Sequence, residues 1–290
     1  FSIPQGNIGE AWVIAAHDNG SSKITNGNLK GLTLKEAYEK QPTLFTEKVY
    51  DKFPLLIKIL DASDNLSVQV HPEDDYAREN ENGELGKTEC WYVLDAKEGT
   101  KLVYGHTAKT KEEFNDKIDR EQWQELFIEE EVKAGDFFYI PAGTLHAIGE
   151  GILIYEVQQN SDTTYRVYDY DRVDKDGNKR ELHIEKTKDV TKVPFEKVTT
   201  SPREEKLEGA TVTYLADEKY FSVFKVEVEG RVSLEKTRTG NLFTVLNGSG
   251  SVEIDGSSYD VKKGDSFILT TECRTYTLKG KMFLIGSYDR

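Results

Sequence analysis

The sequence predicts a mainly β protein with two β-barrel domains and one small helical insertion. Its 290 residues include 15 Tyr and 13 Phe but few patterns with the spacing of a long helix, which favours a β-rich fold over a helical bundle. Short apolar runs alternate with Gly, Pro, Asn and Asp turn signals. The Gly-Asp pair that opens residues 135–139 returns at the start of residues 264–268, again before apolar residues, which indicates a second domain of the same type.

Composition excludes several classes of partner. The net charge of −14 argues against binding to nucleic acid or to an anionic membrane, and any anionic substrate needs a local cationic pocket. No run of about 18 apolar residues and no secretory segment occurs. The only two cysteines, Cys90 and Cys273, lie far apart in the sequence, so we expect reduced thiols and a cytoplasmic location. Because the chain opens at Phe1 without Met, we expect a preceding segment to be missing.

The first third of the chain predicts two strands around a short helix. Residues 9–17 are mostly apolar and predict a buried strand, and Thr33 with Glu36 forms a capping box for a helix that ends before Pro42. Residues 53–61 form an apolar run interrupted by Lys58. Burying a lysine in a strand is costly unless it faces a polar cavity, so we expect Lys58 to face one. An edge strand with this lysine in solvent is the alternative.

Residues 66–72 and 86–94 predict strands whose polar side chains share a face. Ser67, Gln69 and His71 alternate with apolar residues, and Lys87 and Glu89 are two residues apart. Glutamine and histidine on one face of a strand indicate that this face lines a barrel interior that contains water or a metal ion. A solvent-facing sandwich strand, the alternative, more often carries Lys, Thr and Glu.

The central part of the chain predicts a helical insertion followed by further strands. A second capping-box pattern begins a helical insertion near 110–128. Residues 152–159 form a strand with Glu156 and Gln158 on one face, and Arg166 follows among aromatic residues. His183 is expected in an exposed polar strand without a function.

Residues 135–146 present one histidine from a rigid turn. A Gly-Asp turn, a strand and a Pro-Ala-Gly break lead directly to His146. This spacing resembles the second signature of the cupin β-barrels, although their later Asn is not matched and Glu150 stands near its place. The resemblance implies jelly-roll barrels.

Residues 190–210 are rich in Thr, Lys, Pro and Glu and predict a linker. We therefore expect a metal-binding catalytic domain at 1–195 and a metal-free domain at 205–290, since no histidine occurs from 211 to 290.

Four residues from separate strands predict a metal site. Gln69, His71, Glu89 and His146 supply an amide oxygen, two imidazoles and a carboxylate, which suit one divalent ion, with zinc first. A metal-free β-sandwich with scattered polar residues is the alternative.

Several segments, in this order, resemble the type I mannose-6-phosphate isomerases, especially the short bacterial form. They are residues 53–60, 66–72, 87–89, 135–146 and 161–166. The resemblance spans roughly residues 9–190 and implies a zinc enzyme that interconverts mannose 6-phosphate and fructose 6-phosphate. It implies metal ligands at Gln69, His71, Glu89 and His146. The large helical domain of longer relatives is reduced here to the insertion near 110–128, which leaves open what covers the pocket.

The residue chemistry fits this activity. Aldose–ketose isomerisation moves a proton between adjacent carbons through an enediol(ate), so it needs an acid/base and a group that holds charge on oxygen. Arg166 suits the developing oxyanion. The base stays open among Glu156, Lys87 and a water held by the metal. Lys58 and Lys87 add local positive charge for a phosphorylated hexose, and Ser67 can donate to its phosphate.

Other functions remain as alternatives. They are a non-catalytic sugar-binding cupin, an isomerase of a different sugar, and an iron oxygenase on the same barrel. The presence of Arg166 and Lys87 disfavours the binding protein, and the Gln ligand with a cationic pocket disfavours the oxygenase. The sequence does not predict the oligomeric state.

Overall fold

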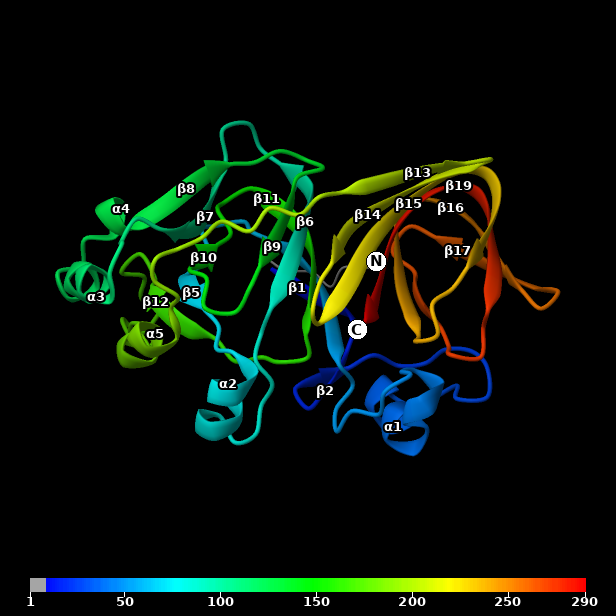
Figure 1. Ribbon diagram of the computed structural model, residues 1–290, viewed down its shortest axis with the longest axis horizontal. Helices are drawn as coiled ribbons and strands as arrows, with labels where there is room; N and C mark the ends of the chain where they lie inside the picture. The colour runs from blue at the N-terminus through cyan, green and yellow to red at the C-terminus, as the bar shows by residue number, and fades with distance from the viewer. Residues whose placement is uncertain (1–8) are drawn as a thin grey trace. The chain divides into compact units, whose positions relative to one another are not determined.

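Antiparallel β-sheets dominate the regular secondary structure of the computed structural model, which describes residues 9–290 (Figure 1). The first five-stranded sheet has the order β1 (Glu10–Ile14), β4 (Leu55–Asp61), β11 (Ile152–Gln159), β6 (Glu89–Ala96) and β9 (Phe137–Ile140). The second has the order β12 (Tyr165–Tyr168), β5 (Val68–Val70), β10 (His146–Ala147), β7 (Lys101–His106) and β8 (Phe127–Glu131). The predicted mainly β class is confirmed.

A shared apolar core joins these two sheets. Trp91 and Ile154 of the first sheet and Tyr104 of the second belong to one cluster of buried side chains. On its other face, the second sheet packs Val68 and Val70 against the helical insertion. The polar residues of the predicted 66–72 strand therefore lie on the face turned away from that insertion.

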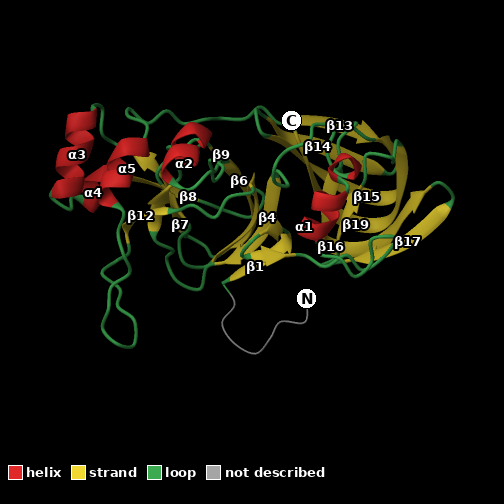
Figure 2. Ribbon diagram, turned by 90° about the horizontal axis from the view of Figure 1, so that it is seen from below, coloured by secondary structure: helices red, strands yellow, loops and turns green. Residues whose placement is uncertain are grey.

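Four helices gather beside the second sheet (Figure 2). They are α2 (Asp74–Asn80), α3 (Lys111–Asp119), α4 (Trp123–Leu126) and α5 (Ile184–Val190). The predicted insertion near 110–128 is confirmed as α3 and α4, and the chain enters β8 at Phe127. Thr110 caps α3 by accepting a hydrogen bond from the Glu113 backbone N–H at 3.2 Å.

Helix α5 corrects one expectation. His183 lies at the N-terminal end of this helix rather than in an exposed strand. Ile184 and Val190 pack against the core cluster that includes Val68 and Phe114. Tertiary packing of these two apolar residues outweighs the polar, strand-like local pattern.

The remaining strands form a seven-stranded sheet with its own core. They are β13 (Arg203–Leu207), β14 (Ala210–Asp217), β15 (Phe221–Glu235), β19 (Thr275–Asp289), β16 (Asn241–Ile254), β17 (Ser257–Lys262) and β18 (Ser266–Leu269), the last paired with β16. The repeated Gly-Asp pattern precedes corresponding strands, β9 and β18. A two-stranded sheet joins β2 (Ala16–His17) and β3 (Gly20–Ser21).

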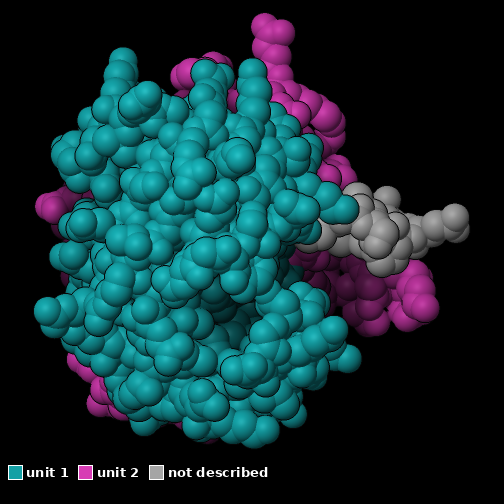
Figure 3. All heavy atoms as spheres, turned by 90° about the vertical axis from the view of Figure 1, so that its right-hand side faces the viewer, with its two compact units in different colours: residues 1–5, 12–57, 200–290 teal, residues 6–11, 58–199 magenta. Residues whose placement is uncertain are grey.

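The described residues form two compact units (Figure 3). One unit contains residues 12–57 and 200–290, and the other contains residues 58–199 with the start of β1. The boundary near residue 200 falls within the predicted linker, whereas residues 12–57 group with the C-terminal strands rather than with the rest of the expected 1–195 domain. This segment holds α1 (Leu34–Lys40), with the predicted capping box at Thr33, and the 3₁₀ helix Pro42–Leu44.

Backbone hydrogen bonds explain why this segment joins the C-terminal strands. The Gly240 N–H donates to Phe45 O at 2.8 Å, and the Thr271 N–H donates to Leu44 O at 2.9 Å. The functional division into catalytic and metal-free domains stays a prediction. Among residues 9–290, no helix has the length and apolar character needed to cross a bilayer.

Candidate metal centre and active site

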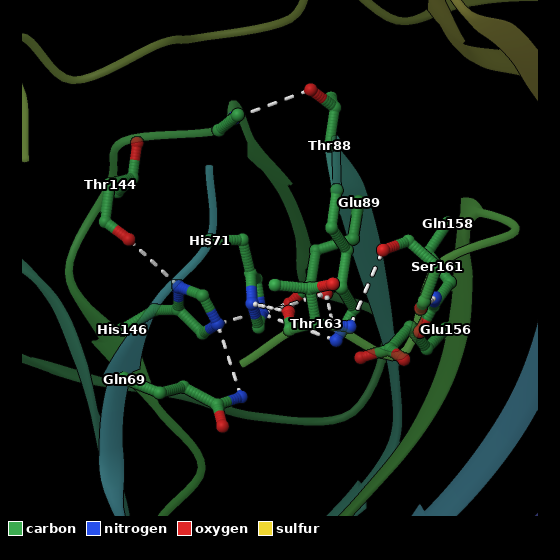
Figure 4. Close-up of polar contacts among 12 residues, drawn as sticks. Gln69, His71, Thr88, Glu89, Thr144, His146, Glu156, Gln158, Ser161 and Thr163 are labelled. Atoms are coloured by element: carbon green, nitrogen blue, oxygen red, sulfur yellow. Dashed lines mark hydrogen bonds and ion pairs between the residues drawn. The ribbon is translucent and has the colours of Figure 1, made fainter. Parts of the chain in front are cut away.

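Three buried side chains converge in the unit formed by residues 58–199. His71, Glu89 and His146 each offer a donor atom, and these atoms lie within 4.8 Å of one another. The Glu89 carboxylate lies between the imidazoles: Oε1 is 3.2 Å from His146 Nε2, and Oε2 is 3.5 Å from His71 Nε2 (Figure 4). Within the described residues, no other group of this kind is found among His, Cys, Asp and Glu side chains.

Strand pairing brings these residues together. His146 in β10 pairs with Gln69 in β5, and Gln69 pairs in turn with Arg166 in β12. Directly paired residues on antiparallel strands point to the same face, so these three side chains form a row across the second sheet. His71 directly follows β5, and Glu89 begins β6 of the first sheet.

The backbone fixes the tautomer of both histidines. His71 Nδ1 lies 2.9 Å from Thr163 O, and His146 Nδ1 lies 2.9 Å from Thr144 O. Because a carbonyl oxygen only accepts hydrogen bonds, each Nδ1 carries the proton and each Nε2 keeps its lone pair. Both lone pairs are therefore available on the side of Glu89, as metal ligation requires.

Burial keeps both imidazoles neutral. It lowers the pKa of His146 to about 4, and it lowers the pKa of His71 well below its ordinary value, with the nearby Lys87 charge adding to the effect. Neutral imidazole is the form that binds a metal ion.

The carboxylate of Glu89 suits a bound cation. Its side chain is fully buried, and neither oxygen accepts a hydrogen bond from any residue the structure describes. The partners nearby are the two imidazoles and the Lys87 ammonium, whose Nζ lies 3.2 Å from Oε2. Leaving a buried carboxylate without hydrogen bonds is costly, and a divalent ion on Glu89 removes that cost. The donor set suits zinc.

Gln69 is close enough to complete this donor set. Its Nε2 lies 3.3 Å from His146 Nε2. Rotation of the terminal amide exchanges Nε2 with Oε1, so the same position can offer an oxygen ligand.

Lys87 is a buried cation in the candidate site. Its Nζ lies 3.2 Å from both Glu89 Oε2 and His71 Nε2. Burial lowers the pKa of Lys87, but the carboxylates of Glu89 and Glu156 outweigh burial, and the net shift is upward. The ammonium form therefore persists at neutral pH.

Glu156 is a buried carboxyl group near this lysine. Burial and repulsion from Glu89 raise its pKa, while Lys87 and Lys58 oppose that rise. The Trp91 indole N–H donates to Glu156 Oε2 at 2.8 Å. A raised pKa is typical of carboxyl groups that exchange protons at neutral pH.

Lys58 and Ser67 are also buried. Lys58 is only 4% exposed, and its Nζ lies 3.4 Å from a carboxylate oxygen of Glu10. The alternative, an edge strand with Lys58 in solvent, is wrong, because β4 lies between β1 and β11 and Lys58 is buried. That Lys58 faces a polar cavity stays a prediction. Ser67 directly precedes β5 and is 7% exposed.

Arg166 shares the sheet face of Gln69, and its guanidinium donates to a backbone carbonyl group. Arg166 Nη1 donates to Glu181 O at 2.9 Å. Burial lowers the pKa of Arg166, and the charge of Arg180 adds to the effect. Arg180 Nε in turn donates to Asp169 Oδ2 at 2.8 Å. The structure therefore brings the four predicted metal ligands and Lys87 into one cluster, and Arg166 is the strand partner of Gln69.

Sequence reasoning missed three partners of this cluster. Trp91 stands two residues after Glu89, and on a strand this spacing places both side chains on the same face. That spacing was the signal in the sequence for the position of Trp91. The carbonyl groups of Thr144 and Thr163 gave no signal, because any residue type supplies a backbone oxygen.

Comparison with known proteins gives consistent results along the whole chain. A family model described as phosphomannose isomerase type I, catalytic domain, matches residues 2–94. A second, described as mannose-6-phosphate isomerase, cupin domain, matches residues 210–289.

Individual relatives agree with these models. A curated mannose-6-phosphate isomerase of Bacillus subtilis (strain 168) is 48% identical over 288 residues, covering 99% of this chain and 91% of the relative. A crystal structure of mannose 6-phosphate isomerase from Bacillus subtilis is 43% identical, with a TM-score of 0.95 over 99% of this chain and 92% of that one. A zinc-bound mannose 6-phosphate isomerase structure shares the fold at 16% identity, with a TM-score of 0.78 over 98% of this chain and 91% of that one.

Proposed function

This chain belongs to the mannose-6-phosphate isomerase family of enzymes, and from that premise we propose that it interconverts mannose 6-phosphate and fructose 6-phosphate with one zinc ion, through an enediol(ate) intermediate. The convergence of His71, Glu89 and His146, with both Nδ1 atoms bound to carbonyl groups, carries the proposal. These residues, with Gln69, would hold the ion. A bound zinc ion supplies Lewis-acid polarisation of the sugar oxygens.

The reaction moves one proton between two carbons of the open-chain sugar. A base takes the proton from C2 while the carbonyl oxygen on C1 gains a proton, which gives the enediol. Return of a proton to C1 and loss of the proton on the C2 oxygen then give the ketose. No oxidant, reductant or leaving group is needed, so the chain's own acid, base and cationic groups account for the proton transfers.

We assign the proton transfer to the buried pair formed by Glu156 and Lys87. A carboxyl group with a raised pKa accepts a proton from carbon and returns it to the neighbouring carbon, and the Lys87 ammonium donates to sugar oxygens. Arg166 stabilises negative charge that develops on those oxygens, because its guanidinium stays protonated.

The phosphate of the substrate needs positive charge inside a chain of net charge −14. Lys58 and Lys87 supply buried ammonium groups, and Ser67 supplies a hydroxyl donor.

In this proposal the catalytic domain extends over residues 1–195, and residues 205–290 form a metal-free partner. Both cysteines are free and buried, which supports a cytoplasmic location.

A coupled assay tests this function directly. Fructose 6-phosphate formed from mannose 6-phosphate is measured on one preparation before chelation, after chelation and after zinc is returned. We expect turnover to disappear with the metal and to come back with zinc. Folded, zinc-loaded protein without turnover would contradict the proposal and favour a sugar-binding protein or an isomerase of a different sugar.

A further inference from the structure

Trp91 connects two parts of the candidate site. It is fully buried in β6, and it shares a strand face with Glu89, two residues before it. Its indole N–H donates to Glu156 Oε2 at 2.8 Å. Its ring meets the His146 imidazole edge-on, with centroids 5.3 Å apart and an interplanar angle of 78°.

The pairing of β6 with β11 makes this contact rigid. Trp91 and Glu156 are direct partners in the antiparallel register, so their side chains leave the first sheet on the same face. A tryptophan has a single polar hydrogen and no acceptor, so it can offer Glu156 only this one hydrogen bond. With Oε2 held, the rotation of the carboxylate is restricted.

The indole also places an apolar surface next to Glu156. Trp91 belongs to the apolar cluster that includes Val93 and Ile154, so the side of Glu156 that faces the ring is closed to water. A charged hydrogen-bond acceptor in such a place gains more from a fixed donor than it does in water.

We propose that Trp91 is a positioning residue for the isomerisation. Its indole N–H fixes the Glu156 carboxylate in place for proton transfer, and its edge-on ring contact aligns the His146 imidazole. The inference rests on the proposed function and on the role of Glu156 in it. Trp91 acts through Glu156 and touches no reacting atom itself.

The matched variants are Trp91→Phe and Trp123→Phe. Phenylalanine keeps an aromatic ring next to His146 but removes the donor to Glu156. Trp123 stacks on Phe127 in the helical insertion, with centroids 5.6 Å apart, and serves as the control. Both variants are measured for kcat and KM with mannose 6-phosphate, for bound zinc, and for the isotope effect of deuterium at C2 of the sugar.

We expect Trp91→Phe to lower kcat at least about tenfold, which is part of the ~10²–10⁴-fold that general acid–base catalysis contributes. KM and bound zinc stay within about twofold of the wild-type values, and the isotope effect does not fall, since the proton transfer itself is slowed. Trp123→Phe leaves all four quantities unchanged. A kcat within twofold of wild type, or a loss of kcat that merely follows a loss of zinc, overturns the proposal.

Two further measurements keep the inference testable. If Trp91→Phe does not fold, the indole N–H is replaced by sulfur with a benzothienyl analogue of tryptophan, and the same fall in kcat is expected. In a chain carrying Trp12→Phe and Trp123→Phe, the substitution Glu156→Gln should shift the fluorescence of Trp91, because the acceptor next to the indole changes from a carboxyl group to an amide. An unchanged spectrum contradicts the contact. The fluorescence shift does not depend on turnover, so it tests the contact between Trp91 and Glu156 by itself. The proposed isomerase activity is tested separately, by the turnover of wild-type protein.

Discussion

Glu89 is the residue on which the candidate site depends most directly. Its buried carboxylate lies between two neutral imidazoles and next to one ammonium group, and it accepts no hydrogen bond from the described residues. The imidazoles are held by backbone carbonyl groups, so their position does not depend on the metal alone. The site is therefore largely preorganised for a cation.

The substitution His146→Ala tests the ligand set. Removing one imidazole leaves a cavity and too few ligands, so we expect bound zinc to fall sharply and turnover to be lost. Zinc is measured by elemental analysis of the purified variant. His17→Ala is the control, because His17 lies in β2 outside the site and should keep both properties. Unchanged zinc in His146→Ala would make the ligand assignment wrong.

The substitution Arg166→Ala tests the proposed catalytic role of Arg166. Loss of a donor to a developing oxyanion typically costs about 10²–10³-fold in kcat, so we expect a fall of that order with zinc retained. Steady-state kinetics and zinc analysis check both points. Arg120→Ala, directly after the last residue of α3, provides an exposed arginine for comparison. If Arg166→Ala loses its zinc, the role of Arg166 is structural.

At the scale of elements, the Pro-Ala-Gly turn between β9 and β10 sets the position of His146. Gly143 has φ +86°, and an added Cβ would meet Lys192 Cγ at 2.8 Å and Val190 O at 2.9 Å. The Gly143 N–H also donates to His71 O at 2.8 Å. One glycine thus links the backbone around both histidine ligands.

The substitution Gly143→Ala should disturb this turn. We expect it to destabilise the protein by more than ~2 kcal/mol, combining a left-handed alanine with the close contacts, and to weaken zinc binding. Gly177→Ala is a matched control, since Gly177 has φ +83° with no atom within 4 Å of an added Cβ. The control should lose about 1 kcal/mol and keep its zinc. Urea unfolding and metal analysis distinguish the two, and equal losses would contradict the packing argument.

For the whole molecule, the proposed zinc ion is expected to add stability. Zinc at 1,000 times its dissociation constant adds about 4 kcal/mol to the folded state if the unfolded chain does not bind it. We therefore expect calorimetry to show a higher unfolding temperature with zinc than after chelation. His146→Ala should show no such difference. An equal rise in that variant would place the stabilising metal outside the candidate site.

Local sequence determined much of this protein. The alternation at Ser67, Gln69 and His71 predicted the lumen-facing strand, because side chains on a strand have a period of two. The capping box at Thr33 and the turn before His146 were equally local features, and both occur as expected. Resemblance across ordered motifs then predicted the ligand set and the family.

Tertiary structure alone decided the rest. Helix α5, the grouping of residues 12–57 with the C-terminal strands, and the contact of Trp91 with Glu156 each join segments far apart in sequence. Strand register and apolar packing between distant segments set them, and neither is encoded in a window of a few residues. A backbone carbonyl that fixes a histidine tautomer is invisible in sequence for the same reason: every residue has one, and only the fold decides which one faces the ring.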